Sequence, residues 1–324
     1  MKTKKKTVLC VILALLIAAD LIISEILFLF ALGRPKKVHS DVMPDPVTTE
    51  EVQDTVSMNR KALHEKTDAW LESAERERVT IESEDGLLLV GEMFFTDRSS
   101  HLWVLAAHGY GYTGTRQAMY DYMLPYAERG YNVLTPDLRA HGESEGRYIG
   151  MGWLDRKDLT RWIDQILLED PAAQIVLHGV SMGGAAVMMT AGEPLPGNVK
   201  AVVEDCGYSS VWDMFSDEAK YLFHIPAFPL LYTASFLSGL QAGYTFQEAS
   251  SLDQIKKVKC PVFFIHGDRD NFVHTDMVMK LYEACPTEKD LFVAEGAGHG
   301  DAYYMDPDSY IRAVFSFLDR CGIE

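Results

Sequence analysis

The sequence is poor in cysteine and has no paired cysteine motif. Five cysteines stand far apart among 324 residues, and none belongs to a CxxC pair. A scattered, odd-numbered set predicts neither a disulfide framework nor a zinc or dithiol centre. An HExxH pattern is absent as well, so the histidines near predicted loops (His141, His178, His266 and His274) indicate no metalloenzyme. We therefore expect neither a metal nor another cofactor.

Basic residues are scarce outside the N-terminus. The chain has 30 Lys and Arg against 47 Asp and Glu, a formal net charge of -17. Seven of the basic residues lie within residues 1–37, together with only two acids, so the rest of the chain is the more acidic part. Such a body repels the phosphates of nucleic acids and of anionic lipids. We expect no nucleic-acid partner, and we interpret the basic N-terminus as a feature of membrane topology.

One long apolar run occupies residues 8–32. As a helix it would span roughly 37 Å, more than the ~30 Å hydrocarbon core of a bilayer. It is also longer than the apolar region of about 7–15 residues in a cleavable signal peptide. Residues 31–33 read Ala-Leu-Gly and resemble a small-x-small cleavage site, so cleavage stays an alternative. The lysines at the extreme N-terminus predict a single-pass protein of the cell membrane with its N-terminus inside.

Two acids interrupt this run, Asp20 at its centre and Glu25. Each costs about 2.5–3.5 kcal/mol at a helix centre, whereas each Leu, Ile, Val or Phe returns roughly 0.3–0.6 kcal/mol. Seventeen such apolar residues lie within 8–32, so insertion is favoured by a narrow margin. Asp20 either snorkels toward the interface or meets a partner transmembrane helix, because charges within membranes usually face protein.

The chain divides into three predicted parts. Residues 1–36 form the anchor, and residues 37–77 form a proline-containing linker followed by an amphipathic helix. Thr48 and Glu51 have the spacing of a capping box at the start of that helix, which we expect to end near Ser73. Residues 78–324 form the main domain, and an aromatic-rich insertion at 208–250 forms a helical cap.

Strands and helices alternate through the main domain. Expected strands cover residues 79–81, 87–95, 102–107, 132–135, 174–178, 200–204, 262–265 and 291–294, and expected helices cover about 115–129, 154–168, 182–191, 275–284 and 307–320. This alternation predicts an α/β fold, a mostly parallel sheet with helices on both faces. A turn sequence, Glu-Asp-Gly at 84–86, predicts that the first two strands are antiparallel.

A GxSxG pattern at residues 179–183 carries the predicted chemistry. An apolar strand ends just before it and a helix of small residues begins just after it, the context of a nucleophile elbow. The glycines would permit a strained turn and close packing. Ser181 is the candidate nucleophile, near a helix N-terminus that favours developing negative charge. The backbone N–H of Met182 is then one donor to the oxyanion of the tetrahedral intermediate.

A serine hydroxyl needs a base, and the base needs an orienting acid. His299 follows the last predicted strand within a glycine-rich loop and is the candidate base. His108 is its rival. Three aspartates follow predicted strands and are candidate acids: Asp205, Asp268 and Asp270.

Residues 79–318 resemble the α/β-hydrolase family, especially its bacterial membrane-anchored, dienelactone-hydrolase-like and prolyl-oligopeptidase-like esterase branches. The motifs that carry the resemblance are GVSMG at 179–183, HGYG at 108–111, DLRAHGES at 137–144 and HGDRD at 266–270, with Ala140 where the family usually has glycine. The resemblance implies that Asp270 is the acid, that Tyr110 N–H is the second oxyanion donor and that His108 is structural.

The function that follows is a serine hydrolase, which cleaves a carboxylic ester through an acyl-enzyme. The substrate is expected to be a small or lipid-like acyl compound, and the catalytic domain to be extracytoplasmic. Eight cap residues are predicted either to line an acyl pocket or to bury the cap against the domain: Phe215, Tyr221, Phe223, Phe228, Leu230, Leu231, Tyr232 and Phe236. The alternatives are a serine peptidase or thioesterase on the same fold, and a catalytically silent membrane-tethered binding protein.

Overall fold

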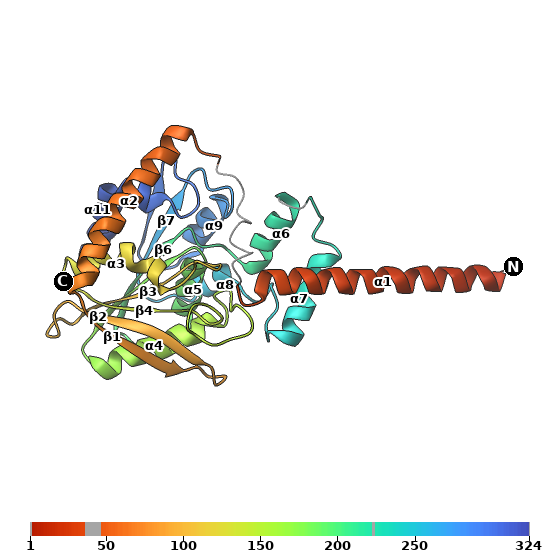
Figure 1. The fold of residues 1–324 in the computed structure, drawn as a ribbon, viewed down its shortest axis with the longest axis horizontal. Helices are drawn as coiled ribbons and strands as arrows, with labels where there is room; N and C mark the ends of the chain where they lie inside the picture. Colours follow the sequence, from red (N-terminus) through yellow and green to blue (C-terminus); the bar gives the residue numbers. More distant parts are fainter. Residues whose placement is uncertain (1, 36–46, 222–223, 324) are drawn as a thin grey trace.

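An eight-stranded sheet forms the centre of the molecule (Figure 1). The structure is a computed structural model that describes residues 2–35, 47–221 and 224–323. The strands are β1 (Glu75–Glu82), β2 (Leu88–Phe95), β3 (Leu102–Ala107), β4 (Asn132–Pro136), β5 (Gln174–Val180), β6 (Val199–Asp205), β7 (Val262–Gly267) and β8 (Lys289–Ala294). Their order across the sheet is β1-β2-β4-β3-β5-β6-β7-β8.

The sheet is antiparallel only at one side. β1 pairs with β2 and β2 with β4 in antiparallel fashion, and the five remaining pairs are parallel. The predicted antiparallel start and mostly parallel sheet are therefore confirmed. Because β3, β5, β6 and β7 run in the same direction, the loops that follow them meet at one edge of the sheet, where α/β proteins place their sites.

Helices cover both faces of the sheet. The helices of the described residues are α1 (Lys2–Leu32), α2 (Glu50–Ser73), α3 (Tyr120–Ala127), α4 (Asp155–Glu169), α5 (Met182–Ala191), α6 (Val211–Tyr221), α7 (Leu230–Gln241), α8 (Ser251–Ile255), α9 (Asp276–Ala284), α10 (Ala302–Met305) and α11 (Pro307–Arg320), with a 3₁₀ turn at Arg116–Met119; α1, α6 and α7 lie beyond the sheet (Figure 1). Successive strand residues face opposite sides. On β3, Leu105 joins the core under α4, α5, α8 and α9, whereas Val104 joins the core under α2, α3, α10 and α11.

The amphipathic helix predicted before the domain is α2, and it lies on the domain. Val56 and Leu63 are buried in the core that α2 shares with α3, α10 and α11. The predicted capping residue is wrong by one position. Thr49, rather than Thr48, caps the helix, because its hydroxyl accepts a hydrogen bond from Val52 N–H at 3.4 Å. Most of the predicted linker, residues 37–46, lies outside the described residues.

The N-terminal helix α1 projects away from the body of the molecule (Figure 1). Within the described part of the chain, Lys4–Leu32 is the one helix whose length and composition would let it cross a membrane. Its carboxyl-terminal end is buried in protein: Phe28 and Leu32 are inaccessible, and Leu32 O accepts a hydrogen bond from Ile149 N–H at 2.7 Å. α1 is thus joined to the domain by packing as well as by the chain.

Both acids of the apolar run contact the cap helix α7. The hydroxyl of Thr233 donates to Asp20 Oδ2 at 2.7 Å, and the Gln241 side chain donates to Glu25 Oε2 at 2.7 Å. The helix that meets Asp20 in the structure therefore belongs to the same chain. A separate partner helix at Asp20 stays a prediction.

Candidate active site

Ser181 occupies the sharp turn between β5 and α5. Its backbone has φ 57° and ψ −118°, a left-handed conformation that is strained for a residue with a side chain. The flanking glycines are needed for space: a Cβ on Gly179 would overlap Gly183 O, and a Cβ on Gly183 would overlap Ala107 O. Ser181 itself carries the strain of the turn, and the flanking glycines permit that turn because they allow the close packing, as the sequence predicted.

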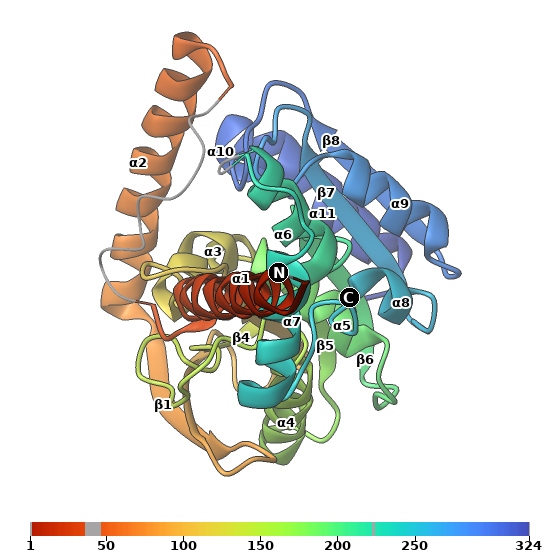
Figure 2. The same cartoon turned by 90° about the vertical axis from the view of Figure 1, so that its right-hand side faces the viewer.

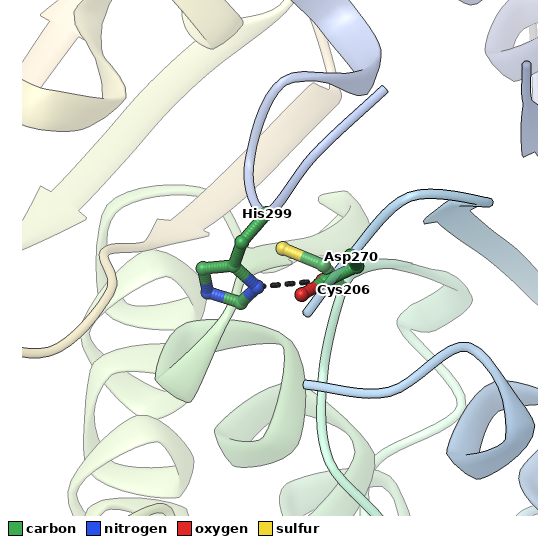
Figure 3. Close-up of side chains that lie close together, drawn as sticks. All are labelled: Cys206, Asp270 and His299. Carbon is green, nitrogen blue, oxygen red and sulfur yellow. Dashed lines mark hydrogen bonds and ion pairs between the residues drawn. The ribbon is translucent and has the colours of Figure 1, made fainter. Parts of the chain in front are cut away.

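Ser181, His299 and Asp270 form one continuous chain of hydrogen bonds. His299 Nε2 lies 2.8 Å from Ser181 Oγ, and His299 Nδ1 lies 2.7 Å from Asp270 Oδ2. The other oxygen of Asp270 accepts from the backbone N–H groups of Phe272 (2.9 Å) and Val273 (2.8 Å), which fixes the carboxylate. The three side chains come from the segments after β5, β7 and β8, and the fold brings together the residues that the sequence singled out. Figure 3 shows the His299–Asp270 contact.

Within this hydrogen-bonded triad, Asp270 and His299 each favour the charged form of the other. Burial alone would raise the pKa of Asp270, but the nearby His299 and hydrogen bonds from His266 and His299 hold that pKa well below its ordinary value. Burial alone would lower the pKa of His299, but Asp270 outweighs burial and raises it. An ionised Asp270 accepts a hydrogen bond from His299 Nδ1–H, which leaves Nε2 free to accept the hydroxyl proton of Ser181.

The other candidates for the acid and the base form hydrogen bonds elsewhere. Asp268 Oδ1 accepts from Gly296 N–H at 2.7 Å, and Asp205 Oδ2 accepts from Tyr310 OH at 3.0 Å. Burial raises the pKa of Asp205 to about 6. His108 Nε2 accepts from Leu138 N–H at 2.9 Å, and burial lowers the pKa of His108 to about 4. The geometry therefore favours Asp270 and His299 over their alternatives.

The sequence missed two side chains that lie against this chain of hydrogen bonds. His266 Nε2 donates to Val273 O at 2.8 Å and also lies 3.3 Å from Asp270 Oδ2. The thiol of Cys206 lies beside Asp270 and His299, and the three potential ligand atoms are within 4.8 Å of one another (Figure 3). His266 lies four residues before Asp270 in the same segment, whereas Cys206 reaches the site because β6 lies beside β7, an adjacency that no local pattern encodes.

Cys206, Asp270 and His299 form a poor metal site. A thiol binds metal as the thiolate, yet burial raises the pKa of Cys206 well above its ordinary value. His299 Nδ1 is engaged by Asp270 in the hydrogen bond described above. The donor set thus suits a hydrogen-bonded array better than metal coordination.

The loop after β3 and the first turn of α5 both lie next to Ser181. A Cβ built on Gly109 would lie 3.4 Å from the Ser181 Cβ, so the loop after β3 passes directly beside the serine. In that loop, Tyr110 N–H donates no hydrogen bond among those between described residues. Met182 is the first residue of α5, and the first N–H groups of a helix have no partner within it. Both predicted donors are therefore available to an incoming oxygen.

An apolar cavity of about 340 Å³ adjoins these residues. It extends to Tyr110 in the loop beside Ser181 and to Phe272, whose ring contacts the His299 ring at 5.0 Å. Its walls come from the end of α1, from α6 and from α7. Of the predicted cap residues, Phe215, Leu230 and Leu231 line it, Tyr221, Phe228, Tyr232 and Phe236 are exposed instead, and Phe223 lies outside the described residues. The contribution of α1 was not foreseen.

One acid lines this cavity. Glu218 projects from α6, and its Oε2 atom is buried without a hydrogen-bond partner among the described residues. Burial raises the pKa of Glu218 to about 7, and the proximity of His299 opposes that rise. No sequence pattern marks Glu218, because its position depends on how the cap folds over the domain.

Comparison with known proteins defines the class. Residues 104–313 match the family model described as the alpha/beta hydrolase family, so the chain belongs to this family and is a hydrolase by fold. It is 29% identical over 200 residues to uncharacterised protein YqkD of Bacillus subtilis, across 61% of this chain and 66% of that protein. It is 26% identical over 247 residues to an uncharacterised protein of Mycobacterium tuberculosis, across 76% and 80% of the two chains.

Solved structures share the fold. An esterase from Pyrococcus furiosus is similar with a TM-score of 0.61 and 29% identity, across 76% of this chain and 93% of that one. An acylaminoacyl peptidase from Pyrococcus horikoshii has a TM-score of 0.55 and 20% identity, across 76% of this chain and 41% of that one. The predicted α/β-hydrolase fold is thereby confirmed.

Proposed function

We propose that the protein is a serine hydrolase that cleaves carboxylic esters, with Ser181 as nucleophile, His299 as base and Asp270 as orienting acid. The observation that carries the proposal is the unbroken hydrogen-bond chain, 2.8 Å from Ser181 to His299 and 2.7 Å from His299 to Asp270. Nucleophile, base and acid in this order are the working parts of a serine hydrolase.

The reaction follows from these positions. His299 Nε2 takes the proton of Ser181 Oγ as that oxygen attacks the ester carbonyl carbon. The resulting oxyanion accepts hydrogen bonds from Tyr110 N–H and Met182 N–H, each worth about 10²–10³ in rate. His299 then gives its proton to the departing alcohol and leaves an acyl-enzyme on Ser181. A water molecule, deprotonated by His299, releases the acid, and Asp270 remains ionised throughout.

The cavity favours an ester over a peptide. Its lining is mostly apolar, with hydroxyl side chains such as Thr113 and a single acid, Glu218, so it suits an acyl chain and offers no paired charges for the two ends of a peptide. The likeness to an esterase at 29% identity agrees with this choice, whereas the peptidase, at 20%, shares the fold alone. A thioesterase would use the same catalytic residues, so only the comparison of ester and thioester substrates distinguishes the two activities.

The test is active-site labelling followed by a substrate panel. A fluorophosphonate should label the wild type and the surface variant Ser73→Ala but not Ser181→Ala. Acyl esters should then be hydrolysed faster than the matching thioesters and aminoacyl amides. Absence of labelling in folded wild type would favour the silent binding protein, and faster amide cleavage would favour a peptidase.

We further propose that α1 crosses the cell membrane once, with the catalytic domain outside the cytoplasm. The support is the length of the apolar helix and the lysines that precede it. Alkaline phosphatase fused to the C-terminus should be active in cells, and green fluorescent protein fused there and exported through the same pathway should stay dark. The reverse pattern would contradict the proposed orientation.

A further inference from the structure

The cap helix α7 presents an apolar stripe to the outside. Phe228, just before the helix, is 73% exposed, and Tyr232, Phe236 and Leu240 are 53%, 61% and 68% exposed. Their spacing of four residues places them along one side of the helix. Large apolar side chains gathered on one exposed face mark an interaction surface rather than ordinary surface.

This stripe lies beside the candidate membrane span. α7 packs along α1, and besides the contacts of Asp20 and Glu25 the hydroxyl of Ser24 donates to Leu230 O at 3.1 Å. In Figure 1 the cap extends from the sheet domain along α1, in the direction of the free N-terminal half. Figure 2, which looks along α1, shows α7 next to it.

The length of α1 indicates how deep in the bilayer its contact with α7 lies. A hydrocarbon core of ~30 Å takes about 20 residues of helix. Counted from the lysine cluster that ends at Lys6, the core reaches to about residue 26. The contacts of Asp20, Ser24 and Glu25 with α7 then lie inside the outer leaflet. α7 therefore supplies, within the leaflet, one hydrogen bond to Asp20 and one to Glu25, and Asp20 Oδ1 is buried without a partner among the described residues.

The inner side of the same helix lines the cavity. Leu231 and Ala234 of α7 face it, together with Leu27 and Ala31 of α1. The membrane helix itself is thus a wall of the space beside Ser181. A cavity built in this way adjoins the bilayer on one side and the hydrolytic residues on the other.

We propose that α7 is seated in the outer leaflet beside α1, with its apolar stripe against lipid acyl chains, and that the cavity takes the acyl chain of a lipid ester directly from the bilayer. The continuity of the stripe with α1 favours lipid over a protein partner. The cleavage of that lipid rests on the proposed hydrolase activity, and the position of α7 rests on the proposed membrane crossing of α1 but not on that activity.

The proposed position of α7 in the outer leaflet is tested without measuring catalysis. The full-length protein in phosphatidylcholine nanodiscs carries a bimane label at Phe236→Cys or, as a control, at Leu168→Cys, which is 78% exposed on α4. The exposed Cys10 is replaced by alanine in both. Lipids with nitroxide-labelled acyl chains should quench the label at position 236 at least three times as strongly as the label at 168. Equal quenching at the two positions overturns the proposal. A second copy or another protein that covered the stripe would keep lipid away from position 236 and give this same result.

The substrate class is tested by filling the cavity from the membrane helix. Ala31→Trp places a large side chain in the cavity, and Ala18→Trp is the same change on the exposed side of α1. In nanodiscs, the ratio of p-nitrophenyl palmitate to p-nitrophenyl butyrate hydrolysis should fall at least ten-fold in Ala31→Trp and keep its wild-type value in Ala18→Trp. An unchanged ratio in Ala31→Trp overturns the acyl-chain assignment. If the wild type hydrolyses neither ester and takes no fluorophosphonate, the proposed function fails, and the quenching result still decides the seat of α7.

Discussion

The hydroxyl of Tyr110 donates a hydrogen bond to the backbone carbonyl of Ala31, with 2.8 Å between the two oxygens. This contact joins the loop beside Ser181 to the end of the helix that we propose spans the membrane. The position of the candidate oxyanion donor, Tyr110 N–H, is therefore held in part by α1. An anchor that only tethered the enzyme would have no such contact with the loop.

Removing this hydroxyl should lower activity while it leaves the backbone donor in place. A hydrogen bond of this kind contributes about 0.5–1.5 kcal/mol. Tyr110→Phe should therefore reduce kcat/KM for a short ester about two- to ten-fold, measured in nanodiscs. Tyr112→Phe, a change at a half-exposed tyrosine two residues away, is the matched control and should keep the wild-type value. A wild-type rate in Tyr110→Phe would show that α1 does not position the loop.

Asp270 should control both the rate and its pH dependence. Because Asp270 raises the pKa of His299, and the base must be neutral to act, kcat/KM should rise with pH through a midpoint above 6.5. Asp270→Asn removes the charge, so burial then dominates and the midpoint should shift to lower pH. The rate itself should fall by about 10³–10⁴. Asp268→Asn, whose side chain accepts from Gly296 N–H and lies 3.9 Å from Arg269 Nε, should keep the rate within about three-fold and leave the midpoint unchanged. A larger loss in Asp268→Asn than in Asp270→Asn would reverse the assignment of the acid.

Glu218 should make acyl-chain binding sensitive to pH. Its pKa is raised to about 7, so the cavity is uncharged below neutral pH and carries a carboxylate above it. KM for a long-chain ester should therefore rise between pH 6 and pH 8 in the wild type and stay level in Glu218→Gln. Asp217→Asn on the same helix, where Asp217 pairs with His274 instead, should behave like the wild type. A KM that rises equally in Glu218→Gln would place the ionisation elsewhere.

The same shift has a consequence for stability. Between its ordinary pKa of 4.5 and about 7, Glu218 keeps in the folded protein a proton that the unfolded chain releases. The free energy of unfolding should therefore fall as pH rises through this window. Chemical denaturation at pH 5 and pH 8 should show a smaller fall in Glu218→Gln than in the wild type, and an equal fall would contradict this.

Gly183 should be intolerant of even one methyl group. A Cβ there would overlap Ala107 O on the neighbouring strand, so Gly183→Ala must push α5 away from β3. We expect a loss of about 1–3 kcal/mol in the free energy of unfolding, measured by denaturant, together with loss of fluorophosphonate labelling. Gly197→Ala is the matched control, because a Cβ at Gly197 meets no atom within 4 Å. Equal stability of the two variants would show that the turn at Ser181 accommodates a Cβ at position 183.

Local patterns predicted the elements well where they were continuous and apolar. The strand expected at residues 102–107 is β3, Leu102–Ala107, because a run buried on both faces is visible in the sequence itself. The first strand was expected only at 79–81 but spans Glu75–Glu82. Its first four residues are exposed and charged, and pairing with β2 makes them a strand. Residues 115–129 were expected to form one helix but form a 3₁₀ turn followed by α3.

The sequence by itself determined the elbow of Ser181, because strand, turn and helix follow one another along the chain, and it offered His299 and His108 as candidate bases. It also indicated a membrane helix, since length and apolarity are properties of one segment. The family resemblance favoured Asp270 over Asp268 and Asp205, and only the tertiary structure shows that Asp270 is hydrogen-bonded to His299 while Asp268 holds Gly296 N–H. The tertiary structure also decided that α1 lines the cavity and that α7 donates a hydrogen bond to Asp20 and another to Glu25. Such contacts join segments about 200 residues apart, and no local pattern of residues encodes which distant surfaces will pack together.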